Sequence, residues 1–132
     1  MPSPRDNNWT ESRALIQGAQ AYLIILPDAS PETPWAFPGG RITRHESPEH
    51  GLRRVLRDLI GVEIEFHVGQ PPFVHNFGSH SVTYRYYQCS IRSGQPQARA
   101  CAELRWVIAG QLRDYTFDQP TQQVVDWLLE RE

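Results

Sequence analysis

Residues suited to phosphate chemistry are concentrated between Gly40 and Gly61. Gly40 ends a Gly-Gly turn, Glu46 follows six residues later, and an arginine-rich segment then runs to Gly61. Guanidinium groups recognise phosphate oxygens through paired hydrogen bonds, and carboxylates hold the hard divalent cations that neutralise phosphate charge. The order of glycine turn, acidic residue, arginine-rich segment and terminal glycine therefore predicts a loop and a helix that handle a phosphate-bearing ligand.

The charge of this segment differs from that of the whole chain. The chain has a formal net charge of −2, which argues against nonspecific binding over its whole surface. Between Arg41 and Asp58, five arginines face three acidic residues, a local balance of +2. All 13 basic residues of the chain are arginines. Two explanations stay open: a genome that favours arginine codons, or selection for forked recognition of phosphate.

Apolar periodicity and turn residues predict the elements that position this segment. Ser47 can cap a helix that starts at Pro48 and ends before Gly61, because these residue types favour those positions. Strands are predicted from short apolar or alternating runs over residues 17–26, 35–37, 62–68, 73–77, 81–91 and 103–108, with a closing helix over 121–131. This order predicts an α/β domain with a mixed β-sheet sandwiched between α-helices.

Length and composition are typical of one globular domain. We expect residues 1–16 to be a polar lead-in and residues 17–132 to form a single domain. No apolar run approaches the roughly 20 residues of a membrane span, and the first residues lack the apolar core of a signal peptide. Cys89 and Cys101 are too few for a metal quartet and suggest no disulfide framework. We therefore expect reduced thiols, a cytoplasmic location and no membrane partner.

The spacing of six residues carries a family resemblance: Gly40, Glu46, Arg54, Leu56, Gly61 and Val62. They resemble the box of the Nudix family, which is glycine, five residues, glutamate, seven residues, then Arg-Glu-apolar-x-Glu-Glu-x-Gly-apolar. Residues 35–40 and 103–106 are also similar to segments of that family, so the resemblance spans about residues 17–130. It implies the Nudix fold, with its mixed sheet between helices.

Three acidic positions of the box do not carry over cleanly. Val55 stands where the family has a glutamate, and Asp58 and Leu59 stand where it has an adjacent glutamate pair. In active members these carboxylates hold Mg²⁺ or Mn²⁺ against a diphosphate, because a hard cation prefers oxygen ligands. The resemblance therefore implies a degenerate box with no assigned catalytic residue. Glu46 and Arg54, which brace the loop against the helix, and Asp58 are its residual positions.

The segment resembles a phosphate-handling site but lacks most of the carboxylates that such chemistry needs, so several functions stay open. We expect a domain that binds a nucleotide-like or oxidised-purine ligand with little or no hydrolysis, and we assign it no cofactor. Arginines can meet the phosphates directly, and Trp35, Phe37 and Phe77 can stack a base. One alternative is a Mg²⁺-dependent hydrolase of nucleoside diphosphate derivatives, whose metal site is rebuilt from Asp58 and Glu103. Another is a protein-interaction domain that keeps only the scaffold.

A second resemblance concerns the downstream half. Residues 75–80 (HNFGSH) are similar to the His-x-Phe-Ser-His stretch in the C-terminal domain of adenine-specific mismatch DNA glycosylases, a Nudix-fold module that recognises 8-oxoguanine. The extra Gly78 shifts the position of Ser79. The resemblance implies DNA as a further open partner and a role in DNA repair. Together with the glycine turn, it predicts ligand binding through Gly40, Arg41, Phe77, Ser79 and His80.

Overall fold

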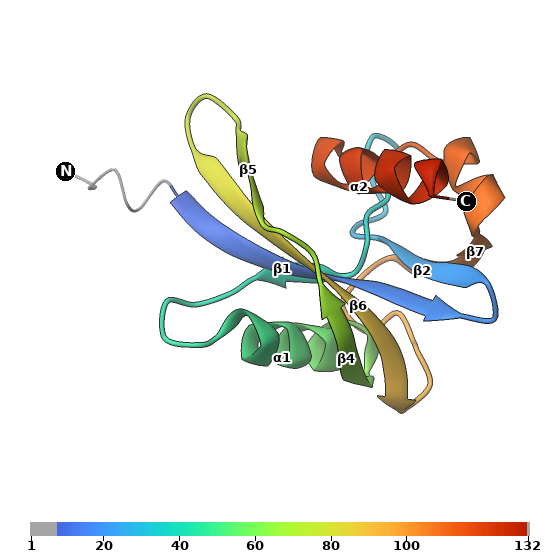
Figure 1. The fold of residues 1–132 in the computed structure, drawn as a ribbon. Coiled ribbons are helices and arrows are strands. Elements are labelled where there is room, and N and C mark those ends of the chain that lie inside the picture. The colour runs from blue at the N-terminus through green and yellow to red at the C-terminus, as the bar shows by residue number, and fades with distance from the viewer. Residues whose placement is uncertain (1–7, 132) are drawn as a thin grey trace.

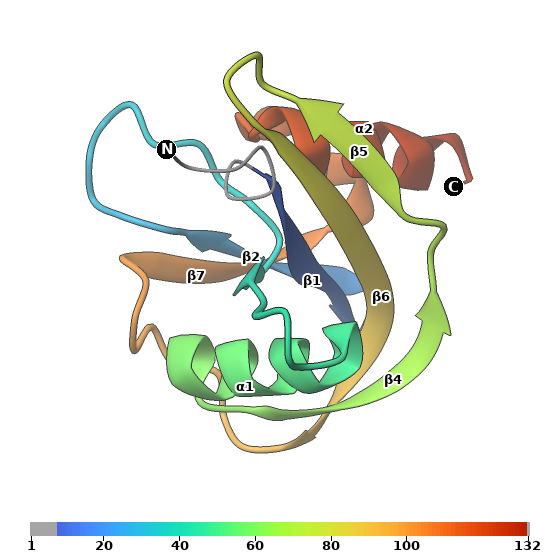
Figure 2. The ribbon, with the colours of Figure 1, turned by 90° about the vertical axis from the view of Figure 1, so that its left-hand side faces the viewer.

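Two long strands, β1 (Asn8–Gly18) and β6 (Ser81–Ser93), form the centre of the sheet in this computed structural model, which describes residues 8–131. The other elements are β2 (Ala21–Leu26), β3 (Gly39–Arg41), α1 (Pro48–Ile60), β4 (Glu63–Gly69), β5 (Phe73–Asn76), β7 (Glu103–Ile108), the 3-10 helix η2 (Ala109–Asp114) and α2 (Gln119–Glu130). The seven strands within the described residues follow the order β4-β6-β1-β2-β7, with β3 also paired to β1 and β5 to β6. Helix α1 covers one face and α2 the other (Figures 1 and 2), which confirms the predicted mixed sheet between helices.

Strand β1 is the largest departure from the sequence prediction. The expected lead-in over residues 1–16 is wrong for residues 8–16, which belong to β1 and pair in parallel with β6. Residues 1–7 lie outside the described residues. Glu11 and Arg13 make this strand look like an exposed segment in the sequence, although both side chains are largely covered in the fold. The folded domain therefore begins well before residue 17.

The strand predicted over residues 17–26 is divided in two. Ala19 and Gln20 form the turn between β1 and β2, with φ values of 48° and 70°. Such left-handed conformations usually belong to glycine, asparagine or aspartate, so neither residue signals a turn in the sequence. The strand expected over residues 35–37 is also replaced: Trp35 and Ala36 form only isolated bridges, and β3 begins at Gly39.

Helix α1 and strand β7 have the predicted bounds, and the remaining predicted elements differ by one or two residues at their ends. Helix α1 has the expected caps: the Ser47 hydroxyl accepts a hydrogen bond from the His50 backbone N–H, and Gly61 ends the helix with φ of 73°. None of the helices in the described residues is long and apolar enough to cross a membrane. Cys89 and Cys101 are both free thiols, and burial raises the pKa of Cys89 to about 12.

The alternation of side chains along the central strands creates two cores. Leu15 faces α2, whereas Ala14 and Ile16 face α1. The core under α1 includes the helix residues Leu52, Leu56 and Ile60. The core under α2 is rich in aromatic side chains, among them Tyr22, Phe37, Tyr84, Tyr86 and Phe117. Because residues two apart on a strand share a face, Trp9, Glu11 and Arg13 lie on the α2 side with Leu15.

Candidate functional site

The loop before α1 is tied to the helix by one ion pair. Arg54 donates to both carboxylate oxygens of Glu46, from Nη2 to Oε1 at 2.7 Å and from Nε to Oε2 at 3.1 Å. The Thr43 backbone N–H also donates to Glu46 Oε1 at 2.8 Å. These bonds, chiefly those from Arg54, lower the pKa of Glu46 to about 2. Glu46 is therefore ionised at any physiological pH and fixes the shape of the loop.

Close packing excludes a side chain at the first of the two glycines before the loop and leaves little room for one at the second. A Cβ at Gly39 would lie 2.6 Å from the Cα of Arg13 and would collide with the carbonyl oxygen of Ser12. A Cβ at Gly40 would lie 3.2 Å from Cγ1 of Val55. The side chain of Val55, one of the positions where the family places an acid, is therefore packed against the loop backbone.

The box positions do not form a set of oxygen ligands. Val55 lies against Gly40, and Leu59 packs partly buried against the core that contains Leu56 and Ile60. Asp58 is exposed on α1. Within residues 8–131 no group of three or more histidine, cysteine, aspartate or glutamate side chains is placed to hold a metal ion. Since Mg²⁺ is held by carboxylate and other oxygen ligands, the residues at these positions do not fit it.

The structure gives no support to a shared metal site of Asp58 and Glu103. Glu103 accepts a hydrogen bond from Arg105 Nε at 2.8 Å, and the two form an ion pair. Its neighbour Leu104 packs against the core under α1. Because successive residues of a strand point to opposite faces, Glu103 points to the face opposite α1, which carries Asp58.

The arginines of α1 are largely engaged within the fold. Arg53 donates to the carbonyl of Ile64 at 2.9 Å, and Arg57 pairs with Glu63 at 2.6 Å. With Arg54 bound to Glu46, all three are held by oxygen atoms of the protein itself. Arg54 and Arg57 are thus paired with carboxylates, and Arg53 is held by a backbone carbonyl.

The two loop arginines, Arg41 and Arg44, are exposed. The guanidinium of Arg41 lies 4.8 Å from the centroid of the Trp9 ring, in a cation–π contact. Arg41 is the Cα partner of Glu11 across the β1–β3 pair, so both residues belong to the α2 side of the sheet. Arg41 therefore joins the box loop to the side chains on that face.

A continuous series of aromatic rings, which we call the aromatic stack, extends from Arg41; two of its contacts are stacked, and the one between Phe77 and His75 is tilted by 51°. It consists of Trp9, His80, Phe77 and His75, with successive ring centroids 4.7, 4.9 and 4.5 Å apart. The ring of Phe77 remains exposed. Trp9 comes from β1, whereas the other three come from β5 and the turn that follows it.

Four of the five predicted ligand residues meet at the aromatic stack. Arg41, Phe77 and His80 belong to it or contact it, and the Ser79 hydroxyl lies 2.9 Å from His80 Nδ1. Gly40 is next to Arg41 in β3 but faces Val55. Sequence reasoning missed Trp9, because it falls in the expected lead-in. The apolar run Ala14-Leu15-Ile16 that follows it was the available signal for a strand that begins before residue 17.

The predicted stacking surface of Trp35, Phe37 and Phe77 is wrong. Phe37 is 1% exposed and packs in the core under α2. Trp35 packs edge-on against Tyr115, with the guanidinium of Arg105 5.1 Å from its ring centroid. Of the three, only Phe77 is free to contact a ligand, and its ring neighbours are His75 and His80.

Sequence reasoning also missed a buried cation on the same face. Arg13 is 8% exposed and donates to Asp118, Thr121, Tyr86 and Glu11. Burial alone would lower the pKa of Arg13, but the contacts with Tyr86 and the two carboxylates outweigh it and raise that pKa. Asp118 is also the N-cap of α2 and accepts a hydrogen bond from the Thr121 backbone N–H. Arg13 thereby joins β1 to the start of α2.

Known sequences resemble this chain over most of its length. Residues 13–128 match the model of the NUDIX domain. A protein of Mycobacterium tuberculosis (strain H37Rv) named "Putative 8-oxo-dGTP diphosphatase 2" is 30% identical over 125 residues, which cover 92% of this chain and 81% of that protein. A Proteus vulgaris protein named 8-oxo-dGTP diphosphatase is 30% identical over 53 residues, covering 40% of this chain and 47% of that protein. The relatives named here give no support to a DNA partner.

Solved structures share the fold. The solution structure of the Escherichia coli ORF135 protein superposes with a TM-score of 0.80 at 18% identity, covering 98% of this chain and 94% of that one. A MutT NUDIX hydrolase from Burkholderia pseudomallei gives a TM-score of 0.76 at 19% identity, covering 90% and 96%. At these identities the likeness concerns the fold alone. It confirms the predicted fold of a mixed sheet flanked by helices.

Proposed function

Because this chain belongs to the NUDIX domain family, we propose that it binds a nucleotide, with an oxidised purine nucleotide as the leading candidate, and hydrolyses it little or not at all. One observation carries the proposal: the Glu46–Arg54 ion pair is intact at 2.7 Å, while Val55 and Leu59 pack as apolar side chains. The part of the box that shapes the loop is therefore present. The part that would hold a cation against a diphosphate is not.

The phosphates of the ligand are assigned to the loop arginines. Arg41 and Arg44 are exposed at the loop, and a guanidinium can bind phosphate oxygens through two parallel hydrogen bonds. The contact between Arg41 and Trp9 holds the guanidinium beside the α2 face of the sheet. A phosphate bound there would lie next to the aromatic stack.

The base of the ligand is assigned to Phe77, the most exposed ring of the aromatic stack. Phe77 is 44% exposed, although His80 stacks on its ring at 4.9 Å and His75 contacts it at 4.5 Å between centroids. Stacking of a base on an aromatic side chain contributes about 1–3 kcal/mol. Ser79 and His80 offer hydrogen-bonding groups at the same place. The names of the two diphosphatase relatives and the similarity of residues 75–80 to an 8-oxoguanine-recognition module support an oxidised purine as this base.

A second candidate is the Mg²⁺-dependent hydrolase, which the names of the relatives favour. It requires oxygen ligands besides Asp58. Glu103 is paired with Arg105 on the other face of the sheet, so it does not supply them in this conformation. The two candidates differ in one measurable property, which is hydrolysis that needs both Mg²⁺ and Asp58.

The experiment combines binding and turnover on the same protein. Calorimetric titration with 8-oxo-dGTP in EDTA should show binding, and Arg41→Ala should weaken it about tenfold, the loss of roughly 1.4 kcal/mol expected for a charge-assisted contact. The matched control is Arg57→Ala, which removes a guanidinium already paired with Glu63; its affinity should stay within twofold. Mg²⁺-dependent release of diphosphate that Asp58→Asn abolishes would overturn the proposal in favour of the hydrolase.

A further inference from the structure

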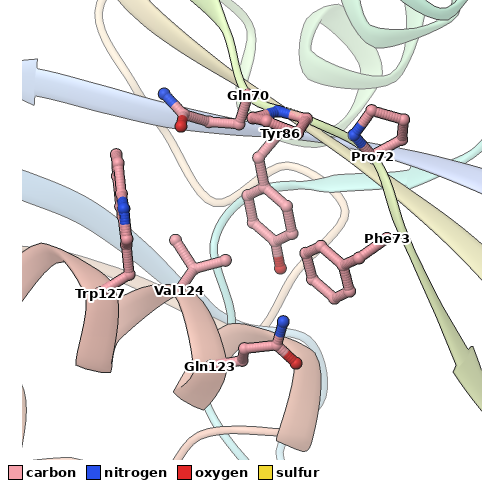
Figure 3. Close-up of a pocket in the computed structure, with 8 residues that line it drawn as sticks. Gln70, Pro72, Phe73, Tyr86, Gln123, Val124 and Trp127 are labelled. Carbon is pink, nitrogen blue, oxygen red and sulfur yellow. The ribbon is translucent and has the colours of Figure 1, made fainter.

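A pocket separate from the loop arginines opens between α2 and the connection from β4 to β5 (Figure 3). Its volume is about 310 Å³. It is lined by Gln70, Pro71, Pro72, Phe73, Tyr86, Gln123, Val124 and Trp127. Ligand pockets typically measure about 300–1,000 Å³, so this one suits a single small ring system rather than an extended molecule.

The walls of the pocket are aromatic and flat. The rings of Phe73 and Tyr86 are nearly parallel, with an angle of 5° between their planes and 5.9 Å between their centroids. Figure 3 shows the indole of Trp127 on the side opposite Phe73, with Val124 between them on α2. Aromatic faces bind flat π-systems by offset stacking or edge contacts. The shape therefore favours a planar aromatic ligand.

The polar groups of the pocket carry no charge. None of its eight lining residues is acidic or basic, and its hydrogen-bonding side chains include the amides of Gln70 and Gln123. An amide offers both an acceptor oxygen and two donor hydrogens, which suits a heterocycle whose edge alternates donors and acceptors. A phosphate or carboxylate would lose hydration here without meeting a cation, at a cost in free energy. The lining of the pocket therefore favours a neutral ligand.

The fold holds this pocket in shape. The Gln70 backbone N–H donates to the Tyr86 carbonyl at 2.8 Å, and Phe73 is the strand partner of Tyr84. Pro71 and Pro72 between them have restricted φ angles. The Tyr86 hydroxyl accepts from Arg13 at 3.2 Å, which fixes the ring that forms one wall. A preformed pocket loses little conformational freedom when a ligand enters.

We propose that this pocket is a second binding site, for a neutral planar aromatic heterocycle of nucleobase size. The ring enters the pocket with Phe73 on one side and Trp127 on the other, and the amides of Gln70 and Gln123 bind its edges. The site is independent of the nucleotide binding proposed at the loop arginines, because none of its lining residues belongs to that loop or to the aromatic stack.

Adenosine and guanosine are suitable probes, since they carry the heterocycle without a phosphate. They are titrated into ¹⁵N-labelled protein, and the indole N–H signal of Trp127 is assigned from a Trp127→Phe sample. We expect saturable shifts of this signal and of the Gln123 amide. Gln123→Trp, which places an indole at the exposed rim of the pocket, should weaken the apparent affinity about tenfold or more. The control Glu130→Trp puts the same side chain on an exposed position of α2 outside the pocket and should leave the affinity within twofold.

Phe77→Ala distinguishes this site from the aromatic stack and should leave the Trp127 response unchanged. Nucleoside binding that Phe77→Ala abolishes and Gln123→Trp spares would overturn the inference, as would the absence of any shift at millimolar nucleoside. Neither result would affect binding of 8-oxo-dGTP through Arg41. Loss of that nucleotide binding with an intact Trp127 response would instead refute the proposed function and leave the second site standing.

Discussion

Removing the buried guanidinium of Arg13 is the strongest test of how strand β1 is held to the start of α2. In Arg13→Met a shorter, unbranched apolar side chain replaces the cation, and Asp118, Thr121 and Glu11 lose the guanidinium donor. In the native protein Arg13 Nη1 donates to Thr121 Oγ1 at 2.8 Å and to Asp118 Oδ2 at 3.0 Å, and Nη2 donates to Glu11 Oε1 at 3.2 Å. The variant therefore leaves two carboxylates without their shared cation.

The size of the effect follows from the burial of each group. Removing one partner of a buried ion pair costs about 3–5 kcal/mol when the remaining charge has no water. The side chains of Glu11 and Asp118 are 18% and 27% exposed, so water can solvate them in part. We therefore expect the free energy of unfolding to fall by about 2–3 kcal/mol, somewhat below that range. For a chain of this size such a loss lowers the melting temperature by roughly 5–10 °C.

Urea unfolding followed by circular dichroism measures this change. Arg57→Met is the matched control, because its ion pair with Glu63 is exposed, and its midpoint should be unchanged within error. In the double variant Arg13→Met with Asp118→Asn, the second substitution should cost less than it does alone, since no unpaired charge remains at Asp118. An Arg13→Met protein as stable as the native one would show that the cluster adds no net stability and would refute this reasoning.

The remaining predictions concern the loop and its helix. Arg54 lowers the pKa of Glu46 from 4.5 to about 2, so the stability that this pair contributes is complete above pH 4.5 and is lost as the pH falls towards 2. Glu46→Gln should make the free energy of unfolding depend less on pH between 4.5 and about 2. The same pH dependence in Glu46→Gln as in the native protein would contradict this role of the ion pair. Gly39→Ala forces backbone atoms apart and should cost about 1–3 kcal/mol in urea unfolding, whereas Gly110→Ala, with open space around it, should be nearly neutral. Leu56→Ala removes a side chain that is 0% exposed and should cost about 2–5 kcal/mol; a loss well below that range would mean that the core under α1 collapses into the space.

Local chemistry explains which parts of the fold were predictable. Ser47 and Gly61 define the ends of α1 because a cap depends on residues within one helical turn. The Glu46–Arg54 contact is likewise local, since loop and helix are adjacent in the chain. Strand β1 was not predictable in this way. Its Glu11 and Arg13 look exposed until distant partners neutralise them.

The sequence by itself determined the family, the loop before α1 and the absence of acids at positions 55 and 59, because spacing and residue type suffice for these. Only the tertiary structure decided what the other side chains do. The parallel pairing of β1 with β6 brings Trp9 against His80, 71 positions away, and so places the aromatic stack beside Arg41. The alternation of β7 turns Glu103 away from Asp58, and Phe37 is buried by strands that the sequence does not align. These outcomes depend on the register and face of strands far apart in the chain, which residue type alone does not fix.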